Sequence, residues 1–202
     1  MKWKAIGILL LALVIVAVGW GYTYYQQHQA NEALETADAE QLSTILERPF
    51  VDGKAAWMET AVQQFDVASA LVLFEHDVVL SDEQWVYLAD LMTFEEFERM
   101  VEAGAPLEVA LPTQTLIEGL YSLNDEPEKW RLAHDQMDVS FLNEHPDVLV
   151  RTVHDGNTEA FTDLIERMDQ NAVPYDTLVP LIQEMEQQAM LEALVQNGYQ
   201  DE

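Results

Sequence analysis

The feature that most constrains the fold is a pair of apolar helices that recurs about every 30 residues over the C-terminal three quarters of the sequence. Five stretches between residues 55 and 202 line up, each with a helical apolar pattern, a short break, a second helical pattern and a polar turn. The second helices are expected to end at Asp77, Gly104, Asp135 or Met137, Met168 and Gly198. No stretch alternates apolar and polar residues for long, so we expect no strands. Because one such unit cannot bury its apolar face alone, the repeat predicts an all-α solenoid of about five stacked helical hairpins.

The apolar residues of these units fall on one face of each predicted helix. In the second helices they follow the spacing i, i+3, i+4. The sets are Ala70, Leu73 and Phe74; Phe97, Met100 and Val101; Phe161, Leu164 and Ile165; and Leu191, Leu194 and Val195. The third unit fits less closely, and its expected face is Trp130, Ala133 and Met137. Small residues recur in the first helices, where they let neighbouring helices approach closely: Ala61, Ala89, Gly119 and Thr152.

The fourth unit, TVHDGNTEAFTDLIERMDQNAV at residues 152–173, resembles an ankyrin repeat. It is similar to that family's pattern Ala-Val-x-x-Gly-Asn followed, after six residues, by Leu-Leu. The segment FERMVEAGAPLE at residues 97–108 resembles the family's second helix and its Gly-Ala turn. The family's Thr-Pro-Leu-His start is absent, so the resemblance does not extend to the hairpin fingers that join its repeats. A generic helical-hairpin solenoid, such as a tetratricopeptide array, is the alternative.

The ankyrin resemblance covers residues 55–202 and implies a binding surface rather than a pocket. In that family the turns between repeats contact protein partners, and the corresponding positions here are Glu108, Asp138 and Tyr175. We therefore expect these three residues to be partner contacts.

Three His-Asp pairs are the candidates for chemistry: His76-Asp77, His134-Asp135 and His154-Asp155. A metal-dependent phosphohydrolase of the HD kind would need such a pair together with a further His and Asp. The repeat places two pairs at helix ends and His154-Asp155 at the bend before Gly156-Asn157, where Asp155 and Asn157 are expected to cap the next helix. Equivalent positions of a linear stack do not converge. With no Cys, phosphate loop, dinucleotide fingerprint or nucleophile elbow, we predict no catalytic residue, cofactor or metal.

The chain begins with a segment that fits a membrane anchor. Lys2 and Lys4 precede the uncharged stretch Ala5–Gly21, which is at the short end of what spans a bilayer. Aromatic residues suited to the membrane interface follow: Trp20, Tyr22, Tyr24 and Tyr25. The lysines predict a cytoplasmic N-terminus and an exported body. A cleaved signal peptide ending near Ala17-Val18-Gly19 is the alternative.

These features predict three segments. Residues 1–25 form a transmembrane anchor or uncleaved signal, residues 26–54 a helical stalk or linker, and residues 55–202 the ankyrin-like repeat domain. The sparse apolar stripe from Gln26 to Leu46 predicts one helix that continues out of the membrane and is stopped by Pro49 and Gly53.

The charge is strongly one-sided, with 37 acidic against 9 basic residues and a net charge of −28. Such a surface repels nucleic acid and either serves solubility in a salty exterior or attracts basic proteins. We expect a single-pass protein of the bacterial inner membrane, with the lipid bilayer contacted by residues 5–25 and the body in the periplasm. Its expected function is that of a non-catalytic adaptor or accessory subunit for a protein partner at the membrane. The alternative is an acidic inhibitor or immunity-type protein that neutralises a basic toxin or enzyme.

Overall fold

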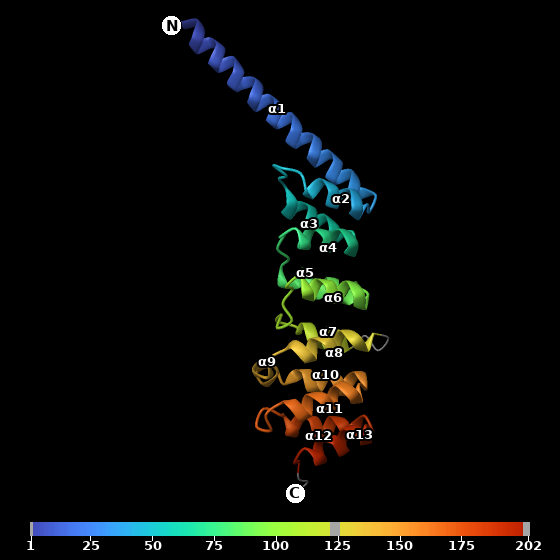
Figure 1. Cartoon of the computed structure of the whole chain (residues 1–202). Coiled ribbons are helices and arrows are strands. Elements are labelled where there is room, and N and C mark those ends of the chain that lie inside the picture. Colours follow the sequence, from blue (N-terminus) through green and yellow to red (C-terminus); the bar gives the residue numbers. More distant parts are fainter. Residues whose placement is uncertain (1, 122–125, 200–202) are drawn as a thin grey trace. The chain divides into compact units, whose positions relative to one another are not determined.

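The computed structural model describes residues 2–121 and 126–199, with side chains from residue 13 onward (Figure 1). This described part is all-helical, with thirteen α-helices and no strand, as the apolar spacing predicts. The chain divides into two compact units, Met1–Leu80 and Ser81–Glu202, which are described separately.

Unit 1 consists of two helical hairpins. Its helices are α1 (Lys2–Glu35), α2 (Ala39–Leu46), α3 (Lys54–Gln63) and α4 (Val67–Glu75). The first hairpin stacks on the second, with α1 packed on α3 and α2 on α4. Ala30 and Ala33 are fully buried, and their small side chains let α1 approach α2 closely.

The single helix predicted from Gln26 to Leu46 is wrong, because the chain reverses at residues 36–38 and α2 folds back on α1. Ala37 adopts the left-handed backbone conformation (φ 53°). Asp38 then caps α2 by accepting a hydrogen bond from the backbone N–H of Gln41 at 2.9 Å. No Gly or Pro marks this bend, which is why the sequence pattern missed it.

In the described part of the chain, no helix is long and apolar enough to cross a membrane. The predicted membrane-spanning segment Ala5–Gly21 is therefore not confirmed. Its side chains at residues 5–12 lie outside those described.

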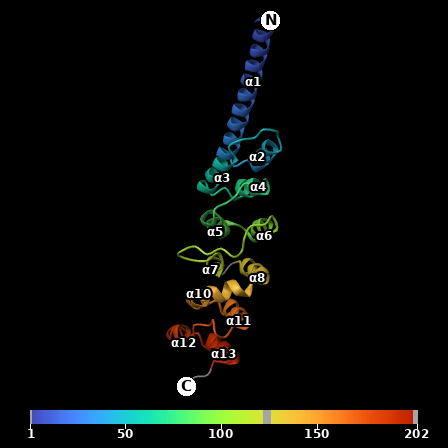
Figure 2. The same ribbon diagram turned by 90° about the vertical axis from the view of Figure 1, so that its left-hand side faces the viewer.

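Unit 2 is a two-layered stack of helical pairs with one additional short helix. Its helices are α5 (Asp82–Leu91), α6 (Phe94–Glu102), α7 (Leu116–Tyr121), α8 (Pro127–Gln136), α9 (Val139–Glu144), α10 (Asp147–Asp155), α11 (Thr158–Arg167), α12 (Tyr175–Glu184) and α13 (Gln188–Gln196). Figure 2 shows the first helices of the pairs (α5, α7, α10, α12) in one layer and the second helices (α6, α8, α11, α13) in the other. This repeat-like arrangement is compatible with a solenoid.

Most of the predicted core positions are buried. The small residues Ala61, Ala89 and Thr152 are completely buried. The large residues Phe97 and Phe161 are also fully enclosed by their neighbours. Val195 is an exception: it is 56% exposed on α13, since no described helix follows to cover it.

At three of the predicted helix ends, the chain leaves the helix through a residue in the left-handed conformation. Asp77, Gly104 and Gly198 follow α4, α6 and α13 with φ of 64°, 99° and 104°. Two features were not predicted. One is the short helix α9, and the other is an isolated antiparallel bridge between Ala110 and Thr115 in the loop that leads to α7.

We expect Gly156→Val to lower the free energy of unfolding by about 1–2 kcal/mol, because Gly156 closes α10 with φ 68° and a branched side chain is strained there. An added Cβ would meet only the Gln187 amide nitrogen, at 3.5 Å, so the cost is conformational rather than steric. Gly156→Asn is the control, since Asn tolerates this conformation. Urea unfolding measures both variants, and equal stability of the two would contradict this account of the turn.

Candidate functional site

Two of the three predicted contact residues meet at one place. The backbone N–H of Asp138 donates to Glu108 Oε1 at 2.9 Å, and both residues are exposed. Asp138 caps α9 by accepting hydrogen bonds from the backbone N–H and hydroxyl of Ser140, each at 2.8 Å. These bonds hold the pKa of Asp138 below its ordinary value. A shallow hollow of about 280 Å³ beside Glu108 is lined by Pro106, Gln136 and their neighbours.

The third predicted contact residue, Tyr175, belongs to another turn. It begins α12, and its ring stacks on that of Tyr199 with 5.4 Å between centroids and 23° between planes. The predicted contact residues therefore lie at two separate turns of unit 2.

Polar side chains bind consecutive turns of unit 2 to one another. Asn143 and Asp169 exchange two hydrogen bonds of 2.9 Å, one through the backbone N–H of Asp169. Gln170 donates to the carbonyl oxygen of Asn197 at 2.8 Å. The hydrogen bond between Glu108 and Asp138 joins two turns in the same manner. Part of this row of turns therefore holds successive helical pairs of unit 2 together, and its exposed carboxylates face solvent.

A Tyr-His-Asp hydrogen-bond chain lies in unit 2, with Tyr121 and His134 buried and the side chain of Asp163 44% exposed. The hydroxyl of Tyr121 lies 2.6 Å from His134 Nε2, and His134 Nδ1 lies 2.5 Å from Asp163 Oδ2. The chain joins α7, α8 and α11. Burial lowers the pKa of His134, although the carboxylate of Asp163 opposes this, and burial raises the pKa of Tyr121 well above its ordinary value.

An acid, an imidazole and a hydroxyl in a row are the elements of nucleophilic catalysis, but here the hydroxyl and the imidazole are buried. Tyr121 is 0% exposed and His134 is 2% exposed. The neutral forms that burial favours suit a hydrogen-bonded core network. The sequence pattern missed it: His134 was assigned to a helix end beside Asp135, whereas its partner lies 29 residues away, one repeat along the chain.

The other two His-Asp pairs belong to different units, with His76-Asp77 directly after α4 in unit 1 and His154-Asp155 at the end of α10 in unit 2. His154 is exposed, and Asp155 pairs with Arg151 at 2.7 Å instead of capping α11, so that prediction is wrong for Asp155. Asn157 caps α11 as predicted, accepting from the backbone N–H of Ala160. Among the described residues, no group of three or more His, Asp or Glu side chains is placed to hold a metal ion.

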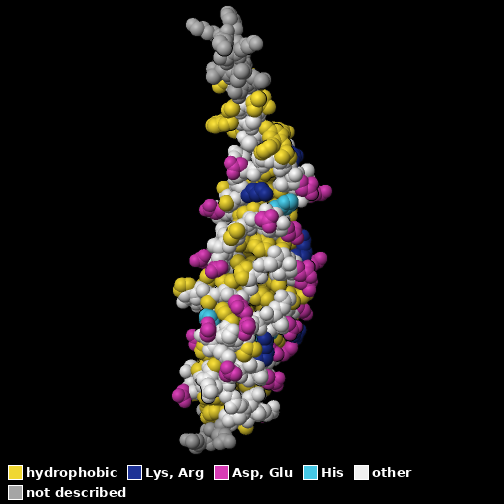
Figure 3. Space-filling model, turned by 60° about the vertical axis from the view of Figure 1, so that its left-hand side comes forward, with side chains coloured by type: hydrophobic (Ala, Val, Ile, Leu, Met, Phe, Trp, Pro, Cys, Tyr) yellow, Lys and Arg dark blue, Asp and Glu magenta, His cyan; other side chains and the backbone are white. Residues whose placement is uncertain are grey.

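Helix α1 of unit 1 carries the most exposed apolar surface. Its large side chains from Leu13 to Tyr25 are exposed, with Trp20 at 78% and Tyr24 at 72% (Figure 3). Phe50, in the loop between α2 and α3, is 82% exposed. A cleft of about 800 Å³ lies between this part of α1 and the loop, lined by Ile15, Trp20, Tyr22, Phe50 and their neighbours.

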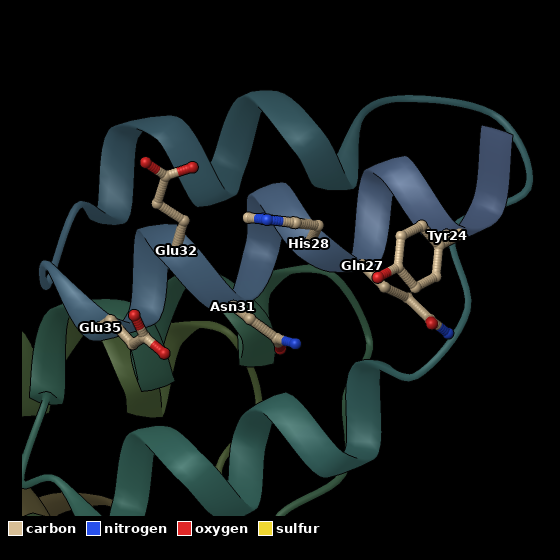
Figure 4. Close-up of a pocket in the computed structure, with 6 residues that line it drawn as sticks. All are labelled: Tyr24, Gln27, His28, Asn31, Glu32 and Glu35. Atoms are coloured by element: carbon tan, nitrogen blue, oxygen red, sulfur yellow. The ribbon is translucent and has the colours of Figure 1, made fainter. Parts of the chain in front are cut away.

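A second hollow, of about 430 Å³, lies along the next turns of α1 (Figure 4). It is lined by Tyr24, Gln27, His28, Asn31, Glu32 and Glu35. Because one helix supplies every lining residue, this hollow is a shallow groove between exposed side chains. Among the residues that line this groove, no hydrogen bond pairs a nucleophile with a base, and we therefore assign no reaction to the groove.

Comparison with known proteins found no match to any family model, curated protein or solved structure.

Proposed function

We propose that this protein is a non-catalytic, membrane-tethered interaction module, an adaptor or accessory subunit that presents its helical pairs to a protein partner. The observation that carries the proposal is the row of exposed apolar and aromatic side chains on α1. An uninterrupted patch of this kind is uncommon on a water-facing helix and is typical of a surface that contacts lipid.

The proposed orientation follows from the basic residues that flank the apolar stretch. Lys2 and Lys4 stay in the cytoplasm, and the body lies in the periplasm of a bacterium, held at the inner membrane. Tethering restricts the search for a partner to the membrane surface and raises its effective concentration.

The body is proposed to be ankyrin-like, with its turns as the contact surface. The left-handed Gly156 followed by the capping Asn157 supports this assignment, as does the bridge from Ala110 to Thr115 between two helical pairs. Glu108 and Asp138 are the proposed centre of the contact surface, since they lie together and exposed.

The tether is tested by charge insertion. We expect the double variant Val14→Arg/Ile15→Arg to release the full chain from membranes into the soluble fraction, because arginine inside a bilayer costs about 2.5–3.5 kcal/mol per residue. Val79→Arg is the control, since Val79 is an apolar residue of the same unit that is 84% exposed and lies outside α1. Alkaline extraction of membranes measures the distribution, and release of both variants, or of neither, would contradict the tether.

The contact surface is tested by in-cell photocrosslinking. A photoreactive residue at Glu108 is expected to join one dominant partner at near-stoichiometric yield, whereas the same residue at the exposed Glu192, in the middle of α13, should not. Crosslinks to abundant neighbours alone, equal at both positions, would argue against an adaptor.

A second candidate function is that of an acidic inhibitor of a basic protein. It is favoured because several basic side chains already pair with acidic residues of the same chain. Arg131 pairs with Glu159, Arg151 with Asp155, and Lys129 is buried beside Glu126. The remaining carboxylates leave a surface suited to a basic partner. Binding by this mechanism would weaken steeply with added salt, whereas an adaptor held by apolar contacts would show little salt dependence.

A further inference from the structure

The loop between α2 and α3, residues 47–53, is held against α1 by hydrogen bonds that involve glutamine side chains of α1. Gln26 is 1% exposed, and its amide donates to the carbonyl oxygen of Pro49 at 3.4 Å. Arg48 donates to Gln29 Oε1 at 2.6 Å. The amide of Gln27 lies 3.7 Å from the position of a Cβ on Gly53. Two hydrogen bonds from about one turn of α1 therefore hold the loop against this helix.

This fastened loop presents Phe50 to solvent at a conformational cost. Phe50 has φ 62°, a left-handed conformation that is rare for a bulky side chain and costs free energy. The ring gains little from burial in return, since it is 82% exposed. Phe65 shares the conformation (φ 60°) and is 60% exposed, but only Phe50 lines the cleft with the aromatic residues of α1.

The surroundings of Phe50 identify the chemistry of what covers it. Tyr22, Tyr24 and Trp20 line the same cleft, together with one charged residue, Asp52 of the loop. Aromatic rings of this kind favour the zone between lipid headgroups and acyl chains. No Asp, Glu, Lys or Arg occurs between Ala5 and Asn31, although the rest of the chain is strongly acidic. This uncharged region is therefore the part of the surface best suited to approach a bilayer, and a zwitterionic one, since the acidic body repels anionic lipid.

We propose that Phe50 is a second membrane contact, whose ring enters the interfacial zone of a zwitterionic bilayer beside the aromatic end of α1. This inference rests on the proposed tether. With α1 as the only contact, unit 1 could rotate about the helix axis. A second contact on a loop fastened to α1 stops that rotation and holds unit 1 against the membrane on one defined side.

The absence of cysteine from the chain allows a direct test with single labelled cysteines. Full-length Phe50→Cys, Phe65→Cys and Val16→Cys variants are each labelled with an environment-sensitive nitrobenzoxadiazole dye and reconstituted into phosphatidylcholine vesicles. Val16 reports on the tether, and Phe65 is the matched control in residue type and backbone conformation. Thermal melting of each labelled variant checks that the fold is retained.

We expect blue-shifted emission and protection from aqueous iodide at positions 16 and 50, and water-like emission with full quenching at position 65. Quenching at 50 and 65 with protection at 16 would overturn the Phe50 contact and leave the tether standing. Protection at all three positions would also overturn it, because the contact would not be specific to Phe50. Quenching at 16 and 50 would refute both proposals. Protection at 50 alone would refute the tether and, with it, the proposal that Phe50 is a second contact beside α1.

Discussion

Replacing Lys129 with alanine is expected to lower the free energy of unfolding by about 3 kcal/mol. Lys129 lies on α8 and is 1% exposed. Its ammonium group donates to the carbonyl oxygens of Ala89, at 3.2 Å, and Met92, and pairs with Glu126 at 2.6 Å. These carbonyls belong to the end of α5, where backbone acceptors have no partner within the helix and a positive charge is favourable.

The loss has two parts that a second variant separates. Alanine leaves the Ala89 and Met92 carbonyls without their donor and also leaves a cavity, whereas Lys129→Met fills much of the space and removes only the polar contacts. We therefore expect Lys129→Met to fall between the wild type and Lys129→Ala in urea unfolding. Arg131→Ala, which removes the exposed pair with Glu159 and a cation–π contact with the Trp130 ring, should lower stability by about 1 kcal/mol or less. A loss from Lys129→Ala no larger than that from Arg131→Ala would contradict this role.

Lys129 also shows where sequence patterns stop being informative. The helical pairs were predictable, because positions such as Phe97 and Phe161 repeat an apolar spacing that only one helix face satisfies. A lysine within a polar stretch reads as a solvated residue. Lys129 can be buried only because the C-terminal end of α5 lies within reach of its ammonium group. The two carbonyl groups that it contacts there are 40 and 37 residues away in the sequence.

The same limit applies to the bends and the candidate site. The turn at Gly156-Asn157 has a Gly and a capping residue that mark it, whereas the turn at Ala37 is set by the packing of α2 against α1 and has no such marker. The ankyrin resemblance was enough to name Glu108 and Asp138 as candidate contact residues. Their mutual hydrogen bond was not, since it depends on the stacking of one turn above the next.

His134 is expected to make the stability of the protein depend on pH near neutrality. Burial lowers its pKa from 6.5, so the folded state holds His134 neutral where the unfolded chain takes up a proton. The stabilisation is fully present above pH 6.5 and is lost as the pH falls towards the lowered pKa of the folded state. Asp163 opposes the shift and Asp135 opposes it weakly, while Arg167 adds to it.

The comparison that isolates this effect is between the wild type and His134→Gln from pH 7.5 to 5.5, a range in which few of the carboxylates titrate. Glutamine removes the titrating group, so the fall in unfolding free energy with decreasing pH should be smaller in the variant, although the variant is less stable at pH 7.5. His154→Gln is the matched control, because it makes the same substitution at an exposed position at the end of α10. If His134→Gln kept the full slope, another group would set the pH dependence. A slope that disappeared in both variants would contradict the distinction between a buried and an exposed histidine on which the prediction rests.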